Sequence, residues 1–132
     1  MADRHAAIGF CFGGMAALTL ARSGVPLAAA VSVHGTLETK ATTGPVQPKI
    51  LVCHGALDPH VPMTQVNAFS EEMTAAGADW QLIVYGGAQH GFTHRDAVAG
   101  STPGVAYDER ADTRSFDAIT RFLAETMTAS TP

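Results

Sequence analysis

Three side chains that together can perform nucleophilic catalysis are spread over the first ninety residues: the thiol of Cys11, the carboxylate of Asp58 and the imidazole of His90. In such a set the histidine takes the proton of the thiol, and the carboxylate fixes the tautomer and orientation of the histidine. The residue types therefore predict covalent acyl transfer through a thioester on Cys11.

The segment around the cysteine reads GFCFG, from Gly9 to Gly13. It matches the G-x-S-x-G nucleophile elbow with sulfur in place of oxygen. We expect glycine at both flanking positions because side chains there would collide with the turn and the neighbouring backbone. The elbow also predicts that Cys11 lies at a helix N-terminus, where the macrodipole favours a thiolate, and that the Phe12 amide donates to an oxyanion.

Each candidate also has a plain structural interpretation. Cys11 can be a buried thiol, Asp58 can begin an Asp-Pro turn, and His90 can be a surface residue of a glycine-rich loop. His60, two residues after Asp58, is the rival base. We expect no metal site, because no C-x-x-C or H-E-x-x-H motif accompanies the remaining candidate ligands, which are Cys53, His54, His60, His90 and His94.

The elements that must position these residues are predicted from hydrophobic periodicity. Nearly continuous apolar runs predict strands at 4–10, 27–33, 50–54 and 80–85. Apolar residues at helical spacing predict three helices: one after Gly13, one from about Pro62 to the Gly77 cap, and one near the C-terminus. The apolar side of the last helix is expected at Phe116, Ile119, Phe122, Leu123 and Met127. Residues 86–110 have no strong pattern and read as a long loop.

Strands alternating with helices predict an α/β fold, with a mostly parallel sheet of about four strands and helices on both faces. In such sheets, ligands bind beyond the carboxyl ends of the strands. Cys11, His34, Asp58 and His90 each follow one of the four predicted strands. We therefore expect all four side chains at the same edge of the sheet.

The chain resembles the dienelactone hydrolase family of α/β-hydrolases. The resemblance lies in GFCFGG, VSVHG, LVCHGALDPHVP, VYGGAQHGFTH and AYDERADTRSFDAITRFL, and it covers essentially the whole chain. It implies Cys11 as nucleophile, Asp58 as orienting acid and His90 as base, acting on a small ester or lactone with no metal or organic cofactor. His94 stands where the enol-lactone enzymes place a substrate-binding arginine, with Arg95 beside it.

Members of that family are longer, and the resemblance implies that residues 1–132 form one truncated α/β-hydrolase domain that begins on the strand before the nucleophile. The first strand is then expected at the edge of the sheet, where its backbone groups are unpaired. We therefore predict a homodimer formed through this exposed first strand. A second hypothesis is a catalytically inactive α/β remnant that dimerises or binds a ligand.

Composition narrows the possible partners. The 132 residues include 8 basic and 12 acidic side chains, a net charge of −4 that does not favour nucleic acid or anionic lipid. The longest apolar stretches have the length of strands, so no membrane association is expected. The first residues, MADRHAAIG, lack the features of a secretory signal, and two cysteines are too few for a disulfide framework. These features predict a cytoplasmic protein with free thiols.

Overall fold

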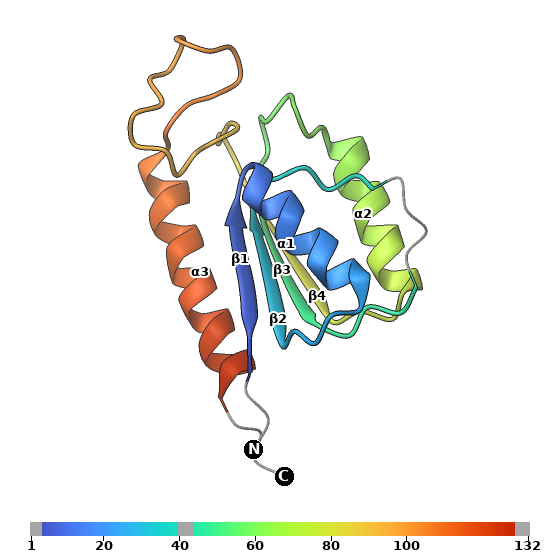
Figure 1. The fold of residues 1–132 in the computed structure, drawn as a ribbon. Coiled ribbons are helices and arrows are strands. Elements are labelled where there is room, and N and C mark those ends of the chain that lie inside the picture. The colour runs from blue at the N-terminus through green and yellow to red at the C-terminus, as the bar shows by residue number, and fades with distance from the viewer. Residues whose placement is uncertain (1–3, 40–43, 129–132) are drawn as a thin grey trace.

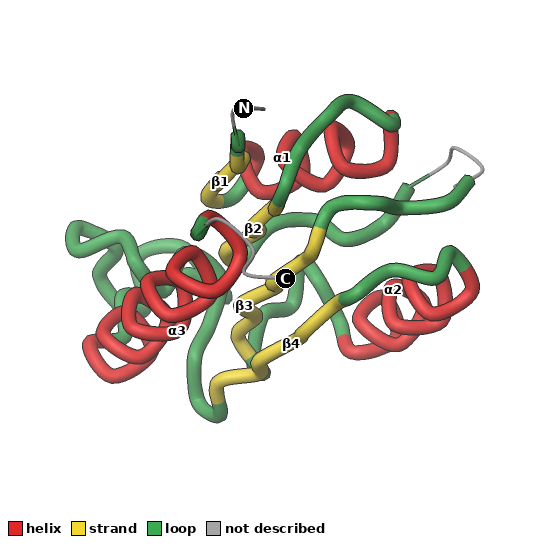
Figure 2. Tube along the Cα trace, turned by 90° about the horizontal axis from the view of Figure 1, so that it is seen from below, coloured by secondary structure: helices red, strands yellow, loops and turns green. Residues whose placement is uncertain are grey.

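Four parallel strands form one sheet in the computed structural model, which describes residues 4–39 and 44–128. The strands are β1 (Ala6–Phe10), β2 (Ala29–Val33), β3 (Lys49–Gly55) and β4 (Trp80–Tyr85), and their order across the sheet is their order in the chain. Helices α1 (Phe12–Ser23) and α2 (Met63–Ala75) cover one face, and α3 (Glu109–Met127) covers the other (Figures 1 and 2). The predicted α/β class is confirmed.

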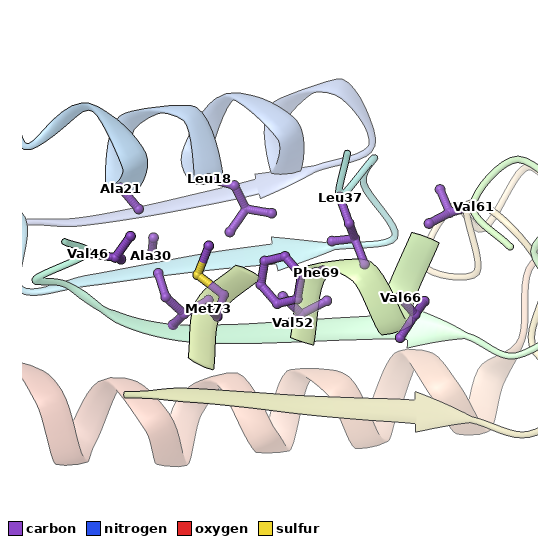
Figure 3. Close-up of a cluster of buried hydrophobic side chains, with 11 residues drawn as sticks. Leu18, Ala21, Ala30, Leu37, Val46, Val52, Val61, Val66, Phe69 and Met73 are labelled. Atoms are coloured by element: carbon purple, nitrogen blue, oxygen red, sulfur yellow. The ribbon is translucent and has the colours of Figure 1, made fainter. Parts of the chain in front are cut away.

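The first face of the sheet is sealed by α1 and α2. Leu18 of α1 and Phe69 and Met73 of α2 are buried against Ala30 and Val52 of the sheet (Figure 3). A paired set of hydrogen bonds ties the two helices together above this core, since the Arg22 guanidinium donates to both oxygens of Glu72, at 2.8 and 2.7 Å. This face is therefore held by apolar burial and by one bidentate ion pair.

Of the described helices, α3 covers the second face, where it packs on β2 and β3. Ala111, Ile119 and Phe122 are buried there together with Phe92 of the preceding loop. The expectation that Phe116 belongs to the apolar side is wrong, because its side chain is 72% exposed. Of the helices in the described ranges, none is both long enough and apolar enough to cross a bilayer.

Strand β1 lies at one end of the sheet, as expected. Within the described residues it pairs only with β2, so its other edge has no strand beside it. Its Ile8 and Phe10 side chains are 44% and 46% exposed. By contrast, every residue of β2 is buried. The strand that leads to Cys11 is therefore much less covered than its neighbour β2.

Candidate active site

Cys11 occupies a sharp turn between β1 and α1. Its backbone has φ 54° and ψ −119°, a left-handed conformation that few residues other than glycine adopt. The Cys11 N–H donates to the Val33 carbonyl of β2 at 3.0 Å, which anchors the turn to the neighbouring strand. This is the strained geometry expected of a nucleophile elbow, and it directs the thiol to the carboxyl edge of the sheet.

The glycines around the turn are not all required by the structure. A Cβ on Gly9 would collide with the backbone of Gly13 and Gly14, so glycine is required there. A Cβ on Gly13 would meet nothing within 4 Å, so the expectation of a collision at that position is wrong. Glycine is also required at Gly35, because a Cβ there would lie 2.7 Å from the Cys11 carbonyl oxygen. The end of β2 thus approaches the elbow at backbone distance.

Asp58 and His90 form a close pair beyond the ends of β3 and β4. His90 Nδ1 lies 2.8 Å from Asp58 Oδ2, and the Asp58 side chain is fully buried. Burial raises the pKa of the Asp58 carboxyl, but the hydrogen bond and charge of His90 and the N–H groups of His60 and Val61 outweigh it, so the pKa lies below its usual value. An ionised carboxylate only accepts hydrogen bonds, so His90 Nδ1 carries a proton, and in the neutral ring Nε2 is the acceptor.

The other ring nitrogen of His90 faces the thiol, with Nε2 3.6 Å from Cys11 Sγ. The loop between β4 and α3 holds it there, because the His90 N–H donates to Gly104 and its carbonyl accepts from Ala106. Gly104 in turn packs against Pro59, where any Cβ would overlap the proline ring. The long loop thus returns to fix His90 beside Asp58. The structure brings the side chains of Cys11, Asp58 and His90 together, with His90 between the other two.

His34, which was assigned no role from the sequence, also contacts the thiol of Cys11. It follows β2 with φ 43°, is fully buried, and places Nδ1 3.2 Å from Cys11 Sγ. Its Nε2 lies 2.9 Å from the Thr93 hydroxyl. Burial, followed by the charges of His94 and His90, lowers the pKa of His34 to about 4. The signal in the sequence was the VSVHG strand end, since Gly35 lets this turn approach the elbow.

Two further histidines lie around the site, and the structure gives neither ring a hydrogen bond to Asp58. The exposed His94 places Nε2 3.8 Å from Cys11 Sγ. The His60 ring lies edge-on to the His90 ring with centroids 5.1 Å apart, while its backbone N–H donates to Asp58 Oδ1 at 2.8 Å. Asp58 is therefore bound to the ring of His90 and to the backbone, rather than the ring, of the rival base His60.

The protonation state of Cys11 differs from expectation. Burial, and to a lesser extent the negative charge of Asp58, raises the pKa of the thiol above its usual value. With its pKa above the usual value, the group is a thiol at neutral pH. Phe12 is the first residue of α1, so its amide has no acceptor within the helix and points to the same edge as the sulfur. Its side chain is 76% exposed.

The parallel sheet, the elbow and the residues at its carboxyl edge define an α/β-hydrolase. A sequence model of the dienelactone hydrolase family matches residues 1–127. The chain belongs to the dienelactone hydrolase family.

Similar proteins agree with this family. A protein of Caenorhabditis elegans, K02A2.1, is 40% identical over 124 residues, which is 90% of this chain and 78% of that protein. The solved structure of a dienelactone hydrolase-like promiscuous phosphotriesterase, P91 from metagenomic libraries, is 42% identical with a TM-score of 0.86 over 93% of this chain. The structure called m3DLH is 41% identical with a TM-score of 0.87 over 97% of this chain.

The chain spans about half the length of these two solved proteins, covering 52% of P91 and 54% of m3DLH. The portion that it matches contains the elbow and the four strands described above. Similarity to these structures therefore extends over the candidate site and its scaffold.

Proposed function

We propose that this protein hydrolyses a small ester or lactone through a thioester on Cys11. His90 acts as general base, and Asp58 orients the His90 ring and stabilises the positive charge that it gains. The Phe12 amide donates to the oxyanion. The observation that carries the proposal is the continuous path from Asp58 Oδ2 through the His90 ring to Cys11 Sγ, with steps of 2.8 and 3.6 Å. No metal or organic cofactor takes part in these steps.

The steps conserve atoms and protons. The Cys11 sulfur attacks the carbonyl carbon while its proton passes to His90 Nε2, and the resulting oxyanion accepts a hydrogen bond from the Phe12 N–H. Collapse breaks the carbon–oxygen bond, and His90 returns the proton to the leaving alkoxide. A water molecule then attacks the thioester with His90 as base again, releasing the carboxylic acid and restoring the thiol.

His90, rather than His34, is assigned as the base because of what lies behind each ring. The ionised Asp58 stabilises the imidazolium that His90 becomes, whereas a Thr93 hydroxyl offers His34 no such charge. With a pKa of about 4, His34 is also a weak acceptor of a full proton at neutral pH. Its nearest approach to the thiol, 3.2 Å, makes it a hydrogen-bond acceptor that positions the resting S–H group.

The test is hydrolysis of short p-nitrophenyl esters and of a small lactone by the full chain, with mass spectrometry of the acylated protein. We expect the acyl group on Cys11 during turnover, and we expect Cys11→Ala to abolish hydrolysis. His5→Ala, an exposed histidine before β1, is the matched control. Equal rates for the Cys11→Ala variant and the unmodified chain would refute the proposal.

P91 is described as a promiscuous phosphotriesterase, so a phosphotriester is a useful second substrate. Attack of the Cys11 sulfur on phosphorus would use the same base and the same oxyanion donor. Hydrolysis of none of these substrates, with a correctly folded chain, would instead support the hypothesis of a catalytically inactive module.

We also propose that a second copy of the chain covers strand β1. The argument is the unpaired edge of this strand within the described residues and the partial exposure of Ile8 and Phe10 on it. Light scattering on the purified chain at micromolar concentration should give the mass of a dimer. A folded monomer under those conditions would exclude this arrangement.

A further inference from the structure

The sulfur of Cys11 also belongs to a second group of ligand atoms, which shares only this sulfur with the triad. Cys11 Sγ, His34 Nδ1 and His94 Nε2 all lie within 4.8 Å of one another. The sulfur is 3.2 Å from the first nitrogen and 3.8 Å from the second. One thiol and two imidazoles converge on a single point from three different loops of the fold.

These separations fit a tetrahedral metal ion. Zinc binds cysteine sulfur at about 2.3 Å and histidine nitrogen at about 2.0 to 2.1 Å, so a tetrahedral angle places sulfur and nitrogen about 3.6 Å apart. The two observed sulfur–nitrogen distances, 3.2 and 3.8 Å, lie on either side of that value. Side-chain shifts of a few tenths of an ångström are enough to bring these pairs to the ideal separation.

The His34 ring is already arranged as a ligand. A metal-binding histidine commonly uses its second ring nitrogen in a hydrogen bond that fixes the tautomer and the orientation. The Thr93 hydroxyl, 2.9 Å from His34 Nε2, supplies that hydrogen bond and leaves Nδ1 facing the sulfur. Because burial keeps this ring neutral at neutral pH, its Nδ1 lone pair is available.

His94 provides access from solvent. A hydrogen bond from its backbone N–H to the Gly91 carbonyl, at 2.9 Å, forms a turn that directs the ring toward the sulfur. A Cβ on Gly91 would lie only 3.3 Å from His94 Nδ1, so glycine leaves room for this ring position. His94 is exposed and Cys11 is half-buried, so an ion reaches the group without opening the core.

We propose that Cys11, His34 and His94 bind one Zn²⁺ ion and that the bound ion reversibly blocks Cys11 as a nucleophile. Binding forms a zinc–sulfur bond and displaces the thiol proton to solvent, without any change of oxidation state. The set Cys-His-His leaves one tetrahedral position for water. His90 Nε2 also lies 3.6 Å from the sulfur, but it is not a member of the group whose ligand atoms all lie within 4.8 Å.

Binding is measured by competition between the full chain and a chromophoric chelator for Zn²⁺, and by the sulfur-to-metal absorption band of Co²⁺. We expect one ion per chain and affinity that rises with pH, because the thiol must lose its proton. Thr93→Val, which removes the hydrogen bond behind His34, should weaken zinc binding by roughly ten- to a hundredfold. His94→Ala removes a ligand and should weaken it at least as much, whereas His5→Ala should leave it unchanged.

A second readout does not require turnover. Saturating Zn²⁺ should protect Cys11 from alkylation by iodoacetamide, and Mg²⁺, which prefers oxygen ligands, should not. Unchanged zinc affinity in a folded His94→Ala variant, or alkylation unaffected by Zn²⁺, would overturn the proposal. A chain that hydrolyses esters without binding zinc refutes only the metal site. A chain that binds zinc, but hydrolyses nothing after a chelator has removed the ion, refutes only the proposed function.

Discussion

Two loops of this protein each present an imidazole to the same sulfur atom, and they do so in opposite environments. The turn after β2 supplies the buried His34, whose second nitrogen meets a hydroxyl. The loop after β4 supplies His90, whose second nitrogen meets the carboxylate of Asp58. The distances to Cys11 Sγ, 3.2 and 3.6 Å, are similar, so proximity alone does not separate the two roles.

The difference between these loops teaches that the group behind a histidine decides what the histidine can do. A carboxylate stabilises a protonated ring, whereas a buried ring backed by a hydroxyl favours the neutral form. The same two features that restrict His34, its burial and the Thr93 hydroxyl, make it suitable as a hydrogen-bond acceptor or a metal ligand. Variants that exchange or remove these backing groups test the comparison directly.

The largest effect is expected from Asp58→Asn. An amide in place of the carboxylate can donate to His90 Nδ1, which favours the wrong tautomer and removes the charge that stabilises the imidazolium. We expect ester hydrolysis to fall by about ten-thousandfold, measured as kcat on the best substrate found. His60→Ala, which alters a ring beside His90 but not its carboxylate, should change kcat by no more than about twofold. A decrease of less than tenfold in Asp58→Asn would remove the distinction between the two loops.

The next effect is on the pH dependence of the free energy of unfolding, and it tests the burial of His34 in the turn after β2. The pKa of His34 is lowered from 6.5 to about 4 by folding, so the unfolded chain binds more protons than the folded chain between these values. The free energy of unfolding should therefore fall as the pH is lowered from about 6.5 to 4, by up to about 1.4 kcal/mol per pH unit from this residue. Urea denaturation at several pH values measures it.

His34→Asn is the control for that measurement, because asparagine tolerates the positive φ of this position. The variant should lose the contribution of His34 to the pH dependence while the contributions of Asp58 and the other histidines remain. The same slope in both proteins would show that His34 is not held neutral by the fold.

The smallest effect is on catalysis by that same His34→Asn variant. A hydrogen bond that positions a resting thiol contributes about 1 kcal/mol, which corresponds to about a fivefold change in rate. The kcat of the variant should therefore fall by about fivefold, with an unchanged pH profile. A thousandfold decrease would instead make His34 the base, and the roles of the two loops would be reversed.

Much of the fold followed from the sequence because its signals are local. Apolar runs predicted all four strands, and β4 was predicted without error at Trp80–Tyr85. The loop predicted at 86–110 ends two residues earlier, because α3 begins at Glu109, where the Asp108 side chain accepts from the Ala111 N–H at 2.9 Å. The outward position of Phe116 was also missed, because helical spacing does not say how wide a face the sheet covers.

The candidate site was predictable where it depends on topology. Parallel strands bring their carboxyl ends to one edge, so Cys11, Asp58 and His90 could be brought together from their positions after strands. The partner of each ring nitrogen could not be predicted, because it depends on distances between loops that are far apart in the chain. His34 and Thr93, separated by 59 positions, are one such pair.

By itself the sequence determined which groups reach the sheet edge: one thiol at an elbow, one carboxylate and several histidines, in an order set by the strands. The tertiary structure decided which histidine is paired with Asp58, which is buried and neutral, and that the Cys11 sulfur rests as a thiol. The physical reason is that residue type and spacing are properties of the chain, whereas burial and the charges around a group arise only when distant segments pack together.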